Sequence, residues 1–198
     1  MTLHYTAKKL KKKKKSIKKL FNIIEKGANI EEKDNNGHTP LYVASRDGHL
    51  DIVEYLVEKK ANIESKDDYE WTSLCTASKN GHLDIVKYLV EKGANIESKD
   101  IKGYTPLLTA SWKGYLDIVK YLVEKGANIE IGCDNGMNPL YIASKNGYID
   151  IVKYLVEKRA NIESKDIYGY SIINCFMERI FRSCKILGEK GSQYRKYR

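Results

Sequence analysis

A 33-residue period runs through most of this 198-residue chain. The run Leu83–Glu97 recurs without change at residues 116–130, and chance does not supply fifteen matched residues in register. Asp, Gly and Ala recur on the same grid, with Cys133 in the fourth Asp position: Asp34, Asp67, Asp100, Asp166; Gly48, Gly81, Gly114, Gly147; Ala44, Ala77, Ala110, Ala143. A period of this length predicts a stack of similar units, each of which buries its apolar face on its neighbours.

One unit is predicted to be a turn, a helix, a second turn and a second helix. Residues 34–38 are turn-formers, and Gly37 is free to take a positive φ. Thr39 and Pro40 suit the start of a short first helix, which Gly48 ends. A second helix is expected to begin near Leu50, because apolar residues recur from there at helical spacing.

The pattern D-x-x-G-x-T-P-L-x-x-A followed by G-H-L-D-I-V-x-Y-L-V-E-x-G-A-N resembles the ankyrin repeat, whose core is T-P-L-H-x-A. The resemblance implies an all-α ankyrin-repeat solenoid with finger turns over residues 16–190. Its parts are a partial unit 16–33, full units 34–66, 67–99, 100–132 and 133–165, and a degenerate capping unit 166–190. A lysine-rich segment, residues 1–15, precedes the array, and a basic tail, residues 191–198, follows it.

The chain departs from the family pattern at two positions. The family's His, which makes hydrogen bonds between repeats, is replaced in turn by Tyr42, Cys75, Leu108, Tyr141 and Asn174. Glu70 stands at the fourth finger position, where the other units have Gly37, Gly103, Gly136 and Gly169. Because glycine at this position indicates a left-handed backbone, we expect Glu70 to be strained.

The net charge of +9 comes from the two ends of the chain. Residues 1–20 hold nine Lys and no acid, and residues 179–198 hold seven bases and one acid, which leaves 19 bases and 25 acids between them. The run Lys8–Lys19 has three interpretations: a charge-extended helix start, a nuclear-import signal, or a contact to the phosphates of nucleic acid or acidic lipid. We expect residues 1–15 to be loosely held, because their lysines repel one another.

No catalytic, cofactor-binding or metal-binding constellation is predicted. The chain has no phosphate-binding glycine motif and no C-x-x-C pair, and His49 and His82 come at repeat spacing, as residues of a helix junction would. Cys75, Cys133, Cys175 and Cys184 are interpreted as reduced thiols of a cytoplasmic or nuclear protein. No apolar run approaches the ~20 residues that a bilayer span needs, so no membrane insertion is expected.

The differences between repeats indicate a binding surface. Units 67–99 and 100–132 share their second helix but differ in the finger and at the end of the first helix. In the ankyrin family the fingertips and the exposed side of the first helix form the concave binding surface, and large aromatics suit an interface. Neutral drift is the alternative explanation. The predicted partner-binding residues are His38, Arg46, Tyr69, Trp71, Lys79, Lys102, Tyr104, Trp112, Lys113, Met137, Lys145, Tyr168 and Tyr170.

The sequence therefore favours a monomeric, non-enzymatic module or adaptor that binds another protein. One alternative is a nucleic-acid or chromatin-associated protein that uses its lysine-rich ends. A nucleic-acid footprint is typically a basic face on the folded body, however, and the middle of this chain is mildly acidic. A second alternative is a fragment of a larger multidomain ankyrin protein.

Overall fold

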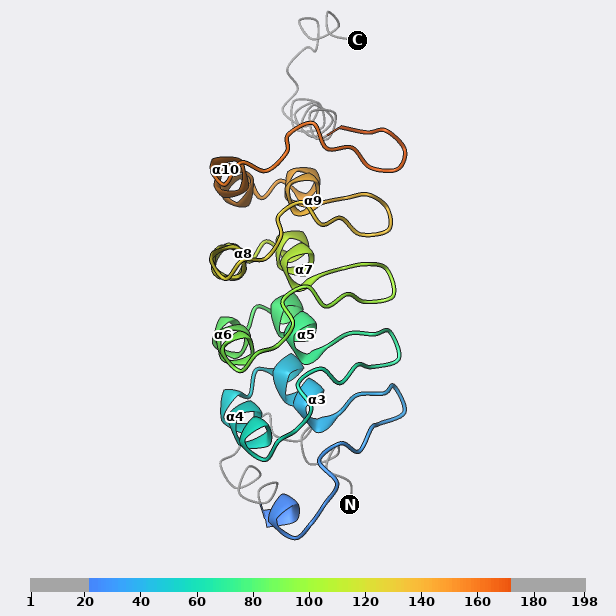
Figure 1. Ribbon diagram of the computed structural model, residues 1–198, viewed down its shortest axis with the longest axis vertical. Coiled ribbons are helices and arrows are strands. Elements are labelled where there is room, and N and C mark those ends of the chain that lie inside the picture. Colours follow the sequence, from blue (N-terminus) through green and yellow to red (C-terminus); the bar gives the residue numbers. More distant parts are fainter. Residues whose placement is uncertain (1–21, 172–198) are drawn as a thin grey trace, which may run out of the picture.

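The computed structural model describes residues 22–171 and shows stacked pairs of helices (Figure 1). Residues 22–25 are helical. The pairs that follow are α3 (Pro40–Asp47) with α4 (Leu50–Glu58), α5 (Ser73–Asn80) with α6 (Leu83–Glu91), α7 (Pro106–Lys113) with α8 (Leu116–Glu124), and α9 (Pro139–Asn146) with α10 (Ile149–Glu157). The predicted fold class, an all-α solenoid of helix pairs, is confirmed.

The helices form two columns along the long axis (Figure 1). The first helices α3, α5, α7 and α9 pack on one another in one column, and the second helices α4, α6, α8 and α10 form the other. The finger turns project from the first-helix column, on the side away from the second helices (Figure 1). Fingers and first helices thus share one side of the array.

Each first helix begins and ends at the residues that the repeat pattern predicts. The side chain of Thr39 accepts the N–H of Tyr42, and Pro40 occupies the first helical turn. Gly48 ends α3 with φ 82°. The corresponding caps of the other first helices are Thr72 and Gly81, Thr105 and Gly114, and Asn138 and Gly147. These caps satisfy backbone groups that a helix end leaves unpaired.

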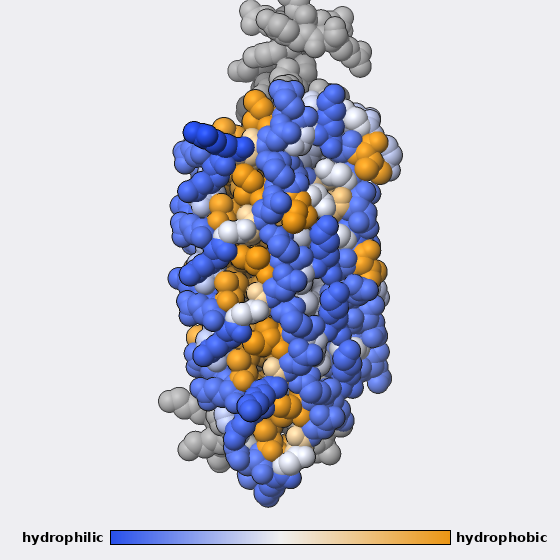
Figure 2. All heavy atoms as spheres, in the orientation of Figure 1, coloured by the Kyte–Doolittle hydropathy of each residue, from blue (hydrophilic) through white to orange (hydrophobic). Residues whose placement is uncertain are grey.

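The core is a continuous row of apolar residues between the two columns. In α4, Ile52, Val53 and Leu56 are fully buried at helical spacing, and their equivalents recur in α6 and α8. Figure 2 shows apolar residues in a stripe along the long axis, between rows of hydrophilic residues. Each unit therefore completes its core on the next, as a repeat array requires.

Polar groups also join each unit to the next one. The Glu97 carboxylate accepts the backbone N–H of Asn128 at 2.6 Å, and the same bond links Glu31 to Asn62, Glu64 to Asn95 and Glu130 to Asn161. On the second helices, the Tyr121 hydroxyl donates to the Lys87 carbonyl at 3.3 Å, and Tyr88 and Tyr154 make the corresponding bonds. The tyrosines of this row are therefore packing residues.

Three non-glycine residues adopt a left-handed backbone among residues 22–171. Glu70 has φ 62°, as its alignment with the finger glycines predicts. Lys60 and Arg159, both with φ 66°, stand where Gly93 and Gly126 close the second helix in other units. A left-handed conformation costs a residue with a Cβ about 1–2 kcal/mol, so these positions are strained.

Glycine at position 70 is expected to give a more stable array than alanine there. Glu70→Gly removes the Cβ strain but also the Lys66–Glu70 ion pair (3.0 Å), an exposed contact that contributes about 1 kcal/mol at most. Glu70→Ala removes the same ion pair and keeps the Cβ. After allowance for the more flexible unfolded chain, Glu70→Gly should exceed Glu70→Ala by about 1 kcal/mol in free energy of unfolding, measured by urea titration. Equal stability of the two variants would contradict the strain.

Several predictions concern residues outside the described range. These are the loosely held segment 1–15, the run Lys8–Lys19, the replacement at Asn174, the thiols Cys175 and Cys184, most of the capping unit 166–190 and the tail 191–198.

Candidate partner-binding face

An aspartate at the start of a finger holds the backbone of that finger. In the second unit, one carboxylate oxygen of Asp67 accepts the N–H groups of Tyr69 at 2.9 Å and Trp71 at 2.8 Å. The third and fifth finger residues, both predicted to bind a partner, are thereby fixed relative to the first. The same pair of bonds recurs at Asp34, Asp100 and Asp166.

Adjacent fingertips are joined by one backbone hydrogen bond. The N–H of Ile101 donates to the Tyr69 carbonyl at 3.1 Å. The equivalent bonds run from Asp68 to Asn36, from Asp134 to Lys102 and from Ile167 to Asn135. Tyr69 and Ile101, 59% and 51% exposed, therefore lie side by side on neighbouring tips.

In the second unit, the finger and the end of the first helix meet through Trp71 and Lys79. The Lys79 ammonium lies 4.5 Å from the centroid of the Trp71 ring, within cation–π range. Trp71 is half-buried, but it belongs to neither apolar core cluster of the described residues. One predicted residue thus partly covers another.

The third unit carries an exposed aromatic group near the end of its first helix. Trp112 is 40% exposed near the end of α7, and its ring lies 6.3 Å from that of Tyr104 at a tilt of 59°. The Lys113 ammonium lies 4.2 Å from the Trp112 ring centroid. The structure brings these three predicted residues together. Lys102, in the same finger, is exposed.

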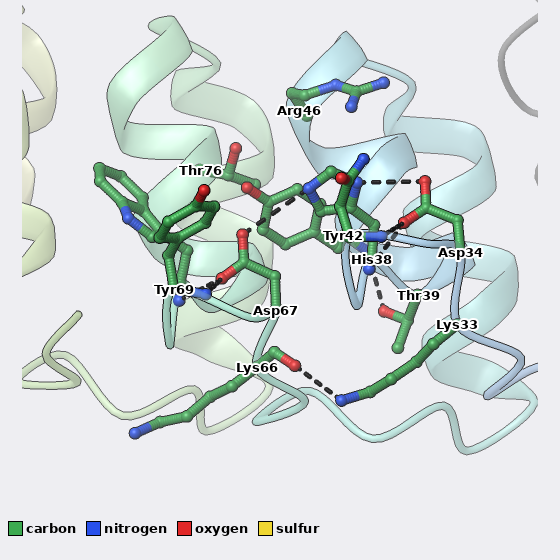
Figure 3. A network of polar contacts seen from close by, with 12 residues as sticks. Lys33, Asp34, His38, Thr39, Tyr42, Arg46, Lys66, Asp67, Tyr69 and Thr76 are labelled. Atoms are coloured by element: carbon green, nitrogen blue, oxygen red, sulfur yellow. Dashed lines mark hydrogen bonds and ion pairs between the residues drawn. The ribbon is translucent and has the colours of Figure 1, made fainter. Parts of the chain in front are cut away.

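The predicted residues of the first full unit are held by neighbours. The His38 ring stacks on Tyr42 at 4.4 Å and lies between two carboxylates, 3.2 Å from Asp34 and 3.7 Å from Asp67 (Figure 3). Arg46 pairs with the adjacent Asp47 at 2.9 Å. This end of the face is polar and already satisfied.

The predicted residues toward the C-terminal side have three different settings. Met137 is half-buried and packs against both apolar clusters, so it contributes to packing. Lys145 is exposed. Tyr168 and Tyr170 are 75% and 53% exposed on the finger that Asp166 holds.

Two residues of this surface were absent from the predicted set: Ile101 and Ile167, at the second finger position. Their matching positions on the 33-residue grid were a usable signal.

Inter-repeat contacts replace those of the missing family His. The Tyr141 hydroxyl donates to Asp166 of the next finger at 2.8 Å, and the Tyr42 hydroxyl contacts Asp67 and Thr76. In the third unit, apolar residues replace both partners of this contact: Leu108 stands at the tyrosine position and Cys133 at the aspartate position. Leu108 packs against Cys133 and Ile142 in a small apolar cluster, so no buried tyrosine or aspartate is left without a partner there.

Acid is expected to weaken the first finger through Asp34. Burial opposes ionisation of Asp34, but the N–H groups of Asn36 and His38 and the His38 ring outweigh it and hold the pKa well below its usual value. A lowered folded-state pKa gives stability that is present above the unfolded pKa, about 3.9, and is lost as the pH falls through the folded pKa. Asp34→Asn should therefore cost about 1 kcal/mol at neutral pH and progressively less below pH ~4, in urea titrations at several pH values.

The matched control for this pH dependence is Asp84→Asn, at the exposed first turn of α6. Its effect should stay within about 0.5 kcal/mol at every pH. A cost of Asp34→Asn that is independent of pH would contradict the role given to the ionised Asp34 carboxylate.

Comparison with known proteins identifies the repeat. The family model described as "Ankyrin repeats (3 copies)" matches residues 3–100 and again residues 98–166. A comparison with curated proteins finds no match. Of the helices in residues 22–171, none is both long and apolar enough to span a membrane.

Proposed function

Because the chain belongs to the ankyrin-repeat family, we propose that it is a non-enzymatic module or adaptor that binds another protein through its fingers and first helices. Ankyrin repeats are generally protein–protein interaction modules. The observation that carries the proposal is the cluster formed by the exposed Trp112 and Lys113 with the half-buried Tyr104. It lies where repeats 67–99 and 100–132 differ, whereas their second helices are identical.

The site is the whole set of predicted residues, with the second and third units at its centre. Exposed aromatic rings give large contact area at low entropy cost, and such residues carry much of the binding energy of protein interfaces. Binding of nucleic acid by this face is disfavoured, because residues 22–171 hold 24 acids and 19 bases.

We place the protein in the cytoplasm or the nucleus, as a monomer. Cys75 and Cys133 are free and buried thiols, which suits a reducing compartment. Burial raises the pKa of Cys75, so this thiol is poorly suited to act as a nucleophile.

Proximity labelling with the full chain as bait, followed by hydrogen exchange of the purified complex, tests the proposal. We expect the partner to slow exchange in the fingers 67–72 and 100–105. Exchange of the backbone amides in the second helices α6 and α8 should be unchanged. Protection confined to the second helices would show that the interface lies on the opposite column.

A further inference from the structure

The second and third units present two aromatic rings, each with its own ammonium group. Lys79 lies over Trp71, and Lys113 lies over Trp112. Both lysines are in the last turn of a first helix, where a positive charge also complements the helix dipole. The dipole explains the charge at the helix end but not the tryptophan beneath it.

These two lysines have no acidic partner in the part of the chain that the structure describes. Two carboxylates of the same two fingers are engaged elsewhere: Asp67 and Asp100 are buried and each accepts two backbone N–H groups. Asp68 is exposed on its fingertip and, among the described residues, forms no ion pair with either lysine. Glu70 pairs with Lys66 on the finger. Lys79 and Lys113 are therefore available to an external carboxylate.

From this geometry we infer that the face binds an acidic segment of its protein partner. Large apolar side chains of the segment contact Trp71 and Trp112, and neighbouring Asp or Glu carboxylates pair with Lys79 and Lys113. Adjacent units lie about 8–10 Å apart. Trp71 and Trp112 lie in adjacent units but at different positions of the repeat, so the test samples two anchor spacings of about 9–10 Å: three residues in a polyproline II segment and seven in a helix. The inference rests on the proposed function and specifies the side chains that the partner segment carries.

Single-stranded nucleic acid is the competing ligand for a surface of aromatics and lysines. Two features weigh against it. Asp68 and Asp134 are exposed on the fingertips beside this surface, and acids outnumber bases over residues 22–171. A polyanion would meet repulsion along its length, whereas a peptide with a few carboxylates meets only the two lysines.

The test uses the full chain and a panel of synthetic peptides that carry two leucine or phenylalanine anchors at either spacing. Asp or Glu, Lys or Ser flanks the anchors in different members of the panel, and an oligouridylate is included. Binding is measured by fluorescence anisotropy at low and high salt. Lys79→Glu with Lys113→Glu is compared with Lys87→Glu plus Lys120→Glu. The control lysines lie over Tyr121 and Tyr154 on the second helices, so charge change and ring contact are matched.

We expect the acidic peptides to bind best, with affinity reduced at least about tenfold by the Lys79/Lys113 reversal and by high salt, and little changed by the control pair. Equal binding of acidic and Ser-flanked peptides, preference for Lys-flanked peptides or the oligouridylate, or no binding by any peptide would overturn the inference. If the labelled partner protects the fingers but the Lys79/Lys113 reversal leaves its affinity unchanged, the proposed function stands and the acidic chemistry fails.

Discussion

Gly114→Ala is expected to lower the free energy of unfolding by about 3 kcal/mol. Gly114 ends α7 with φ 82°, a conformation that costs an alanine about 1–2 kcal/mol. A Cβ at this position would also lie 2.5 Å from Cε1 and 2.7 Å from Cζ of Tyr148 in the next unit. The ring must therefore shift within a packed junction, and overpacking of this kind costs about 1–3 kcal/mol.

Gly126→Ala in the same unit separates the two contributions. Gly126 has φ 91°, and nothing lies within 4 Å of the Cβ that an alanine would add. This variant should lose about 1–2 kcal/mol from the backbone conformation alone. Urea unfolding of both variants gives the contribution of the Tyr148 ring by difference. Equal losses would mean that the ring moves aside without cost.

Most of the fold could be predicted because the same local signals, helix caps, helix ends and turn residues, recur in each repeat. The Thr39 cap, the Gly48 helix end and the left-handed backbone of Glu70 follow from matched positions on the 33-residue grid. Each depends on the residue's own backbone and its close neighbours in sequence. Local rules of this kind transfer from one unit to the next.

Contacts between units were harder to predict. Tyr141 reaches Asp166, and Leu108 packs against Cys133, each 25 residues further along the chain. Considered singly, Leu108 and Cys133 are two unrelated departures from the pattern. They explain each other only when the stacking of one first helix against the next finger is known, because the pair changes from polar to apolar together.

The sequence predicts which repeat positions belong to the candidate face, but it does not predict which contacts their side chains make. The repeat grid places Trp71 just before the start of α5 and Trp112 near the end of α7, but it does not predict that Lys79 covers Trp71 or that Met137 packs inward. Those outcomes depend on rotamers chosen in three dimensions. The thirteen-residue assignment therefore remains a prediction about binding, with Trp112 as its most exposed aromatic at a helix end.

Trp71→Ala combined with Trp112→Ala is expected to weaken partner binding by more than about 2 kcal/mol, roughly thirtyfold in Kd. Both side chains lie outside the apolar core clusters of the described residues. Each makes a contact with a lysine that contributes about 0.5–1 kcal/mol at an exposed site. Loss of both contacts should lower the free energy of unfolding by about 1–2 kcal/mol, so the double variant should unfold at a somewhat lower urea concentration than the parent chain and stay folded without urea.

The matched control is Ile149→Ala combined with Val156→Ala. These side chains are 55% and 45% exposed, but they lie on α10, in the second-helix column. Their loss should leave partner affinity within about twofold of the parent, as expected for residues outside an interface.

The most direct measurement is the Kd of the proximity-labelled partner for the parent chain, the double tryptophan variant and the α10 control, by titration calorimetry, with the urea midpoint of each protein. Binding through the fingers and first helices predicts a loss of affinity confined to the tryptophan variant, which stays folded in the absence of urea. A tryptophan variant that keeps both its fold and the parent's affinity would contradict the account.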